Sequence, residues 1–287
     1  MPDSMFIFLT RESKNYTSKN FYQGSSVLGD GEVPVYVEDR TLSVVVPAYN
    51  EGKRILPILT DIQNNMPEVQ EIIVVCDGKD NTAEVSRSAG SKVRVLEFKE
   101  RLGHGGAVFE GFKASSSDYV CFIDADGAAP WYEVRRLFRM VSKETPAVIG
   151  SRWSEGARIL KKESLRNIVG GRVYHYLALM VLGVREKDSF CGLKIFTKDL
   201  ALELTKRVTV IDRAFNIALM YHLKLMGIKV REVGIEWSHN EDTNLPVSLK
   251  VIAMMLLTLF GLRLRHKIDN RSLHKKLSSV RKEVKFY

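Results

Sequence analysis

Two carboxylates one residue apart are the clearest chemical feature of the sequence. Asp124 and Asp126 belong to the segment 124–127, directly after the apolar run 119–123. Carboxylate oxygens bind hard divalent cations, and Mg²⁺ typically takes one or two protein carboxylates while substrate phosphates complete its shell. Asp-rich turns also cap helices and strands, so the pair alone leaves a structural role open. We interpret it as a site for Mg²⁺ or Mn²⁺ and a diphosphate.

Polar residues also follow three other short apolar runs. Run 42–46 is followed by Pro47, Ala48, Tyr49 and Glu51, and run 71–76 by Asp77. Run 92–98 is followed by the Gly-rich turn 101–106 with His104, and run 119–123 by Asp124 and Ala125. In parallel sheets ligands bind beyond the carboxyl ends of the strands, and unpaired N–H groups at a helix start favour anions. We expect the four loops to converge on one rim. The turn is not a dinucleotide fingerprint, because Val108 stands where a third Gly is required.

Three arginines follow a further strand-like run at 147–149. Arg152 comes directly after it, and Arg158 and Arg166 stand in the next connection. A guanidinium group can grip phosphate oxygens through two parallel hydrogen bonds. Each arginine taken alone would more often be ordinary surface charge. Together they favour phosphate binding.

Apolar runs alternate with helical patterns along most of the chain. Helices are expected near 52–65, 80–89, 104–116, 164–182 and 213–226, with another opened by Pro130, and a strand is expected over 228–237. This alternation predicts an α/β fold: a Rossmann-like, mostly parallel sheet with helices on both faces. His222 lies on the apolar side of the 213–226 helix and is expected to be a satisfied core histidine.

Length and composition fit one domain with appendages. The chain has 287 residues, 45% of them apolar. We divide it into an N-terminal extension (1–40), an α/β domain (41–245) and a basic C-terminal segment (246–287). The three cysteines are odd in number and lie in or beside apolar runs, which indicates buried thiols and a cytoplasmic location.

The C-terminal segment combines an apolar run with a basic tail. Residues 251–262 are strongly apolar but only 12 long between Lys250 and Arg263, whereas a membrane span needs about 20 residues. Residues 261–287 hold nine Lys or Arg and only two acids, Asp269 and Glu283. The net positive charge of this tail is most of the formal net charge of +9 of the whole chain. A buried core helix stays open, but amphipathic C-terminal helices on an anionic membrane surface, peripheral to the inner face of the cell membrane, are favoured. Nucleic-acid binding is weaker, since the tail lacks interleaved aromatics.

The motifs together resemble a known family. Residues 47–51 (PAYNE), Asp77-Gly78, 103–107 and 124–127, followed by Gly150-Ser151-Arg152, are similar in order and spacing to family 2 glycosyltransferases of the GT-A fold, over about 41–265. Residues 122–134 and 190–194 most resemble the branch that contains dolichyl-phosphate glucosyltransferases and dolichyl-phosphate mannose synthases.

The resemblance implies roles for the residues that match. The nucleotide-binding set would be Pro47, Ala48, Tyr49, Glu51, Asp77, His104, Asp124 and Ala125. Asp126, with Asp124, would hold Mg²⁺ or Mn²⁺, and the catalytic set would be Asp126, Arg152 and Arg166. Arg158 and Arg166 would meet the acceptor phosphate. An inverting transfer of hexose to a polyprenyl or dolichyl phosphate is implied, with glucose from UDP-glucose as the first guess.

The sequence also departs from the family pattern. Many relatives carry Lys where His104 stands, and usually Asp and Glu where Asn216 and Ala218 stand, so the 213–226 helix is given no catalytic role. Alternatives are therefore a GDP-mannose-dependent enzyme, a glycan-acceptor enzyme, or a catalytically silent nucleotide-sugar binder at the membrane surface. Retention of Asp124 and Asp126 argues against the silent binder.

Overall fold

The computed structural model describes residues 40–211, 214–240 and 256–264, all within the unit Val37–Tyr287. The strands are β1 (Leu42–Ala48), β2 (Val69–Cys76), β3 (Val93–Glu97), β4 (Tyr119–Phe122), β5 (Ala147–Ser151), β6 (Arg158–Lys161), β7 (Lys194–Thr197), β8 (Arg231–Gly234) and β9 (Glu236–Ser238). The helices are α1 (Ile55–Asn65), α2 (Thr82–Ser88), α3 (Gly103–Ala114), α4 (Trp131–Phe138), α5 (Leu165–Leu182), α6 (Lys198–Arg207) and α7 (Phe215–Leu225). A further helix covers 256–264.

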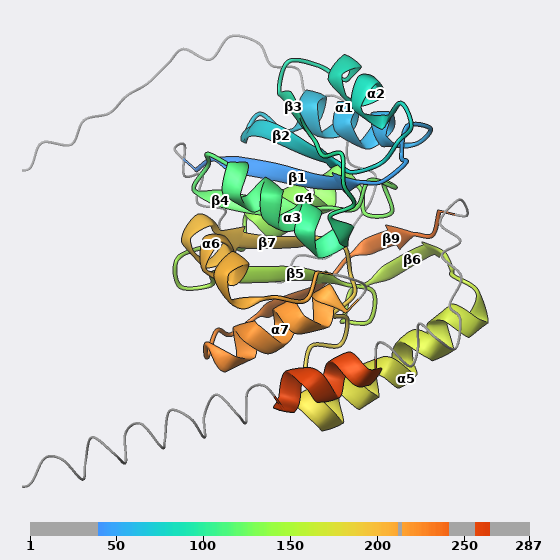
Figure 1. Cartoon of the computed structure of the whole chain (residues 1–287), viewed down its shortest axis with the longest axis vertical. Coiled ribbons are helices and arrows are strands. Elements are labelled where there is room, and N and C mark those ends of the chain that lie inside the picture. The colour runs from blue at the N-terminus through green and yellow to red at the C-terminus, as the bar shows by residue number, and fades with distance from the viewer. Residues whose placement is uncertain (1–39, 212–213, 241–255, 265–287) are drawn as a thin grey trace, which may run out of the picture. The chain divides into compact units, whose positions relative to one another are not determined.

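A seven-stranded sheet carries the fold, in the order β3-β2-β1-β4-β7-β5-β8 (Figure 1). Neighbouring strands run parallel except at β7, which is antiparallel to both β4 and β5. The prediction of a mostly parallel α/β sheet is confirmed. The reversed strand was not predicted, because residues 190–194 were noted only for their family resemblance.

Alternating side chains along the strands build one core on each face of the sheet. On β1, Val45 packs into a core with α3, α6 and α7, whereas Val44 and Val46 pack into a core with α1 and α4. Figure 1 shows α3, α6 and α7 in front of the sheet. Strands buried on both faces read as continuous apolar runs, which is why the sequence of β1 is so uniform. Cys76, Cys121 and Cys191 are free and buried, as expected.

The predicted single strand 228–237 is wrong. The chain forms β8, which pairs with β5 in the main sheet, and then β9, which pairs with β6 in a separate two-stranded sheet. The switch falls at Gly234, where a Cβ atom would lie 2.3 Å from the carbonyl oxygen of Glu155. Only glycine allows the turn 154–157 to pass so close to the strand. Ile235 then donates to Ser151 O at 3.0 Å and accepts from Arg158 N at 3.0 Å, which joins the two sheets.

The C-terminal predictions are covered only in part. The helix at 256–264 buries Leu259 and Leu262 and exposes Leu257, Phe260 and Leu264. The rest of the predicted segment 246–287 and nearly all of the extension 1–40 lie outside the described residues. Within the described ranges, every helix is too short or too polar to cross a bilayer.

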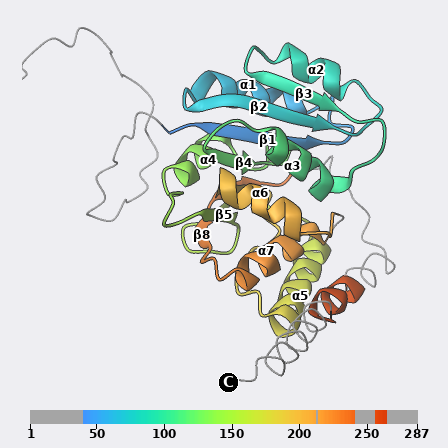
Figure 2. The same cartoon turned by 60° about the vertical axis from the view of Figure 1, so that its left-hand side comes forward.

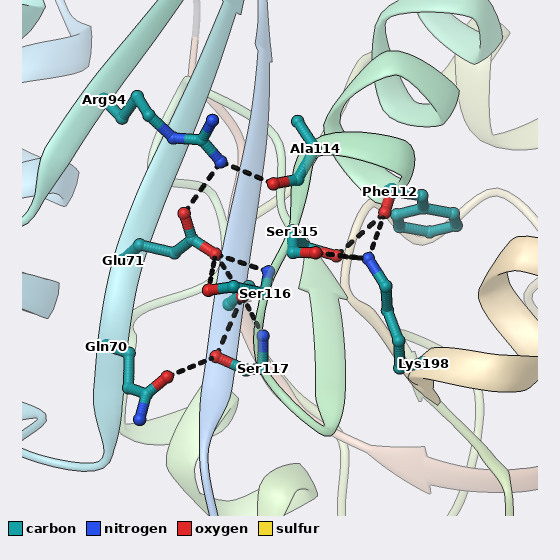
Figure 3. Close-up of polar contacts among 10 residues, drawn as sticks. Gln70, Glu71, Arg94, Phe112, Ala114, Ser115, Ser116, Ser117 and Lys198 are labelled. Atoms are coloured by element: carbon teal, nitrogen blue, oxygen red, sulfur yellow. Dashed lines mark hydrogen bonds and ion pairs between the residues drawn. The ribbon is translucent and has the colours of Figure 1, made fainter.

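A polar cluster at the edge opposite the predicted rim ties strands β1, β2 and β3 to the connection between α3 and β4 (Figure 3). Glu71 on β2 accepts from Ser43 Oγ at 2.8 Å, from Ser116 N at 2.7 Å and from Arg94 Nη2 at 2.8 Å. Beside it, Lys198 donates to Phe112 O at 2.6 Å and to Ser115, where α3 ends. Cations near the last carbonyl groups of a helix stabilise its C-terminus. The cluster therefore fixes the α3–β4 connection on the sheet.

The Glu71→Ala variant is expected to lower the free energy of unfolding by about 1–3 kcal/mol at pH 7, because partly buried donors lose their acceptor. Hydrogen bonds from Ser116, Ser43 and Arg94 outweigh burial and lower the pKa of Glu71. A lowered carboxyl pKa stabilises the fold above the ordinary value of 4.5, and this is lost as the pH falls through the folded-state pKa. Urea unfolding at several pH values measures both effects. Glu110→Gln, in the exposed pair with Lys113, is the control and should change little.

Candidate active site

Strands β1 to β4 end at one edge of the sheet, and the loops after β1, β2 and β3 are bonded to one another there. After β1, Asn50 accepts from Lys79 N at 2.9 Å, which joins the first loop to the second. After β2, Asp77 accepts from Leu102 N at 2.8 Å, which joins the second loop to the third. The expected convergence is confirmed for these three loops, and the charges of Glu51 and Arg54 reach Asp124 on the fourth. The rim is bonded together by its own polar groups.

Asp77 is held at the start of α3. One of its carboxylate oxygens accepts from the backbone N–H groups of Leu102 and Gly103, at 2.8 and 3.2 Å. The other lies 3.7 Å from the Arg101 guanidinium. Two of the N–H groups expected to cradle a phosphate are thus already satisfied by Asp77. The carboxylate fixes the turn and leaves its second oxygen beside Arg101.

Tyr49 and Arg101 form a stacked pair across the rim. The guanidinium carbon of Arg101 lies 3.1 Å from the centroid of the Tyr49 ring, and that ring is 47% exposed. A guanidinium group packs well on an aromatic face. Arg101 was not among the predicted site residues, although it is the first residue of the Gly-rich turn 101–106. The pair presents one flat, cationic surface to solvent.

Glu51 is fixed rather than free. Its carboxylate pairs with Arg54, at 2.8 Å from Nη2, and its backbone N–H donates to Thr82 Oγ1 at 2.8 Å. Asp80 accepts from Gly52 N at 3.1 Å and also bonds Thr82. The loop after β1 is therefore tied to the start of α2. Pro47 and Ala48, also predicted here, lie within β1, where Ala48 is buried.

Asp124 and Asp126 end the rim beyond β4. Asp126 accepts from Ala128 N at 3.0 Å, and Ala125 between the two is buried. Burial raises the pKa of both carboxyl groups, and the charge of Asp124 raises that of Asp126 further. Neither carboxyl group ionises readily while its neighbour is charged. A bound cation would stabilise both negative charges, so the pair is a favourable place for a cation. Within the described ranges, no group of three His, Cys, Asp or Glu side chains surrounds such a position.

A buried lysine lies behind Asp124. Lys194, the first residue of β7, is fully buried, and its ammonium group donates to Cys191 O and, at 2.8 Å, to Asn216 Oδ1. Burial lowers its pKa to about 8, while Asp188 and Asp124 act in the opposite direction. Its charge in turn favours ionised Asp124. Asn216, noted as a departure, thus bonds a residue beside the rim.

Arg152 is bound to two carboxylates. Its guanidinium meets Asp188 through Nε at 2.7 Å and Nη2 at 2.9 Å, and Glu163 through Nη1 at 2.6 Å. The Arg152 backbone N–H also donates to Asp188 at 2.9 Å. The charge and hydrogen bonds of Arg152 hold the pKa of buried Asp188 below its usual value. The arginine predicted to grip phosphate therefore has its donors engaged within the protein.

His104 turns away from the rim. Its ring packs edge-on against Phe122 and Phe215, with centroids 6.1 and 5.8 Å away. Burial, with the nearby charge of Lys194, lowers its pKa to about 4, so the ring is neutral at pH 7. His104 can offer an N–H donor but no positive charge. This orientation does not match the phosphate contact expected of it.

Of the remaining predicted arginines, the structure describes the side chain of Arg158 only. Arg158 lies on β6 with an exposed side chain, 3.6 Å from Glu236. Arg166 belongs to the first turn of α5, and its side chain lies outside what the structure describes. The predicted core residue His222 bonds Ala218 O at 2.8 Å and is partly exposed.

Gly192 leaves room for Asp124. A Cβ atom at Gly192 would lie 1.8 Å from Asp124 Oδ2, so Gly192→Ala must displace the carboxylate. Misplacing a reacting group by about 1 Å can cost 10²-fold in rate, and we expect a loss of about that size in kcat/KM with little change in Tm. The matched control is Gly171→Ala on α5, where a Cβ meets nothing within 4 Å. Equal activity of the two variants would contradict this reading of Gly192.

Solved structures share this architecture. Glucosyl-3-phosphoglycerate synthase from Mycobacterium tuberculosis, in complex with Mn²⁺, uridine diphosphate and glucosyl-3-phosphoglycerate, superposes with a TM-score of 0.60 at 21% identity, covering 79% of this chain and 80% of that one. Mannosyl-3-phosphoglycerate synthase from Rubrobacter xylanophilus gives 0.58 at 20%, covering 79% and 75%. The fold, with its acidic pair beyond β4, is the GT-A fold of glycosyltransferases.

Sequence comparison defines the family. The model of glycosyl transferase family 2 matches residues 43–205. Dolichyl-phosphate beta-glucosyltransferase of Dictyostelium discoideum is 30% identical over 230 residues, 73% of this chain and 70% of the relative. The Homo sapiens enzyme of that name is 32% identical (72% and 70%), and that of Saccharomyces cerevisiae 31% (76% and 72%). The chain belongs to glycosyl transferase family 2.

Proposed function

We propose that this enzyme moves glucose from UDP-glucose to a dolichyl or other polyprenyl phosphate, with inversion at the anomeric carbon. The observation that carries the proposal is the rim itself: three loops bonded to one another, beside two partly buried carboxylates one residue apart after β4. Several relatives with about 30% identity over most of the chain are dolichyl-phosphate beta-glucosyltransferases. These names support the choice of glucose and of a lipid phosphate acceptor.

The donor side of the site is formed by β1, β2 and β4. Tyr49 and Arg101 offer a flat surface for a nucleotide base, and Asp77 offers its second oxygen to a base or ribose donor. Asp126 is the better ligand for Mg²⁺ or Mn²⁺, because one of its oxygens is not used by Ala128 N, and Asp124 is assigned to the nucleotide. The bound cation would supply positive charge to the diphosphate leaving group. The raised pKa values of both acids fit such an ion.

The acceptor would need little activation by the protein. A phosphate monoester has a second pKa of about 6 and is already an anion at neutral pH, so no strong general base is required. The protein would mainly position the two substrates and stabilise the charges that develop. Arg152 is paired with Asp188 and Glu163, so it would line the site without donating to a phosphate. It could bind a phosphate directly only if the substrate displaced one of these carboxylates. Arg158 and Arg166 remain candidates for the acceptor phosphate.

Three alternatives stay testable. They are transfer from GDP-mannose, transfer to a glycan, and binding of a nucleotide sugar without transfer. Incubation with radiolabelled UDP-glucose or GDP-mannose, Mn²⁺ and either dolichyl phosphate or glycan acceptors separates them. We expect lipid-extractable label from UDP-glucose. No lipid-extractable label with any donor would rule out the lipid acceptor, and UDP binding without any turnover would establish the silent binder.

The membrane assignment is a separate part of the proposal. We place the enzyme peripherally on the inner, cytoplasmic face of the membrane, with the basic segment 246–287 against anionic lipid. We expect weaker sedimentation with anionic vesicles when four basic residues of the full chain are changed to Gln: Lys275, Lys276, Arg281 and Lys282. The remaining vesicle binding should also depend less on salt concentration. Unchanged sedimentation would remove the tail from the proposal.

A further inference from the structure

Lys194 is a charged side chain inside the protein whose hydrogen-bond partners are neutral. It is fully buried at the start of β7, and its ammonium group donates to Cys191 O and, at 2.8 Å, to Asn216 Oδ1. Neither acceptor carries a charge that would balance the ammonium group. Burying an ammonium group without a carboxylate bonded to it costs free energy, and charges buried at such a cost cluster at functional sites.

The charge of Lys194 acts on the acid pair of the rim. Its pKa is lowered by burial to about 8, so the group is mainly protonated at neutral pH. Burial raises the pKa of Asp124, and among the charges that oppose this effect the charge of Lys194 is the largest, ahead of that of Arg152. The ammonium group also lies 5.1 Å from the centroid of the Phe122 ring, at the end of β4. The positive charge is therefore placed directly behind the rim.

Lys194 also supports the turn that touches Asp124. The bond from its ammonium group to Cys191 O closes the turn 191–194. Gly192 lies within that turn, so close to the acid that a Cβ atom would be 1.8 Å from Asp124 Oδ2. Loss of the lysine would release the turn from one side of the carboxylate. Lys194 thus acts on Asp124 through the backbone as well as through its charge.

Asn216 keeps this charge from being neutralised. It stands in the first turn of α7, which lies beside α6 in Figures 1 and 2. Its amide oxygen accepts from Lys194 without bringing a negative charge. A carboxylate at the same place would form a buried ion pair with the ammonium group, and the charge felt at the rim would then be much smaller. The neutral amide leaves the field of Lys194 directed at Asp124.

We propose that Lys194 is a positioning residue for the sugar donor, and that neutral Asn216 is what allows it to act as one. The lysine holds the 191–194 turn against Asp124 and places a positive charge behind the acid pair. Such a charge attracts a diphosphate and repels a divalent cation, so it sets the balance between the two. The inference rests on the proposed function, because it assigns the diphosphate of a nucleotide sugar to this end of the rim.

The isosteric variant Asn216→Asp tests the role of the charge. By titration calorimetry in EDTA, its affinity for UDP is expected to fall by about threefold to tenfold, because the new carboxylate cancels the charge of Lys194. Its affinity for Mn²⁺ alone, followed by water proton relaxation, should rise by about the same factor. The urea midpoint should not fall, because the carboxylate still accepts from Lys194. The matched control is Asn65→Asp, an exposed position on α1, which should leave both affinities unchanged.

Two further variants separate charge from packing. Asn216→Ala removes the acceptor without adding a charge, so its affinity for UDP should stay within about twofold of wild type although its stability falls. Lys194→Met removes the charge and the bond to the turn, and should weaken UDP binding in EDTA by about tenfold or more. Its control is Lys198→Met, which removes a partly buried lysine at the opposite edge of the sheet and should bind UDP like wild type.

The outcomes also separate this inference from the proposed function. Unchanged affinities for UDP and Mn²⁺ in Asn216→Asp, with normal glucose transfer, would overturn the positioning role and leave the proposed function intact. Equal losses of UDP affinity in Asn216→Ala and Asn216→Asp would overturn it too, since the effect would then come from packing. Opposite shifts of the two affinities without any transfer by wild type would refute the proposed function alone. Absence of UDP binding by wild type would refute both.

Discussion

The Asp126→Asn variant is expected to lower kcat/KM for hexose transfer by about 10²- to 10³-fold, with Tm nearly unchanged. The amide keeps the shape of the side chain and an oxygen that can accept from Ala128 N. It removes the negative charge that would bind Mg²⁺ or Mn²⁺. Initial rates with UDP-glucose, together with Mn²⁺ titration followed by water proton relaxation, measure both the activity and the metal affinity.

Chelation and pH test the same site without mutation. Removal of divalent cations by EDTA should abolish transfer, and added Mn²⁺ should restore it. Because burial raises the pKa of Asp124 and Asp126, protons compete with metal at a pH above the ordinary aspartate value of 3.8. Metal affinity should therefore fall as the pH drops towards that range. The control is Asp61→Asn, an exposed position on α1. Full activity of Asp126→Asn in EDTA would exclude a metal-assisted reaction at this pair.

The second large effect is on stability. The Asp188→Asn variant is expected to lower the free energy of unfolding by about 3 kcal/mol or more, because it leaves a largely buried guanidinium with one carboxylate instead of two. Asp188 is almost fully buried and receives three hydrogen bonds from Arg152. Its lowered pKa stabilises the fold above the ordinary value of 3.8, and this is lost as the pH falls through the folded-state pKa.

Urea denaturation of Asp188→Asn against Glu97→Gln measures this difference. Glu97 pairs with Arg87 at the surface, where both side chains are more than half exposed, so its loss should cost less than about 1 kcal/mol. Similar midpoints for the two variants would mean that Arg152 finds other partners when Asp188 is changed.

The first half of the fold was readable in the sequence because its signals are local. The runs that form β1 and β2 are continuous, β-branched and followed at once by polar turns, so both the strands and the converging loops were predicted. The second half depends on contacts distant in sequence. Nothing local to 228–237 shows that the 154–157 turn passes against Gly234 and divides the strand. β7 has only four residues, and its reversed direction follows from its pairing with β4 and β5.

The site shows the same limit. Spacing placed Tyr49, Asp77 and the Asp124–Asp126 pair at one edge of the sheet, because each comes just after a strand. It could not show that Arg152 is bonded to Asp188, 36 positions away, or that Lys194 lies behind Asp124. Nor could spacing show which way His104 points: Gly103 adopts a φ of +74°, and the next side chain faces Phe122 and Phe215. The direction of a side chain at a helix start is not visible in the spacing of motifs.

The two carboxylates that hold Arg152 stand on either side of α5. Glu163 comes before the helix and Asp188 after it, so one guanidinium closes a loop of chain that contains the whole of α5. Such a non-covalent closure reduces the conformational freedom of the enclosed segment and works from either end. A displacement of α5 would therefore reach Arg152 through both Glu163 and Asp188. An acceptor phosphate that competes for Arg152 would loosen the same loop, which couples occupancy of the rim to the freedom of the helix.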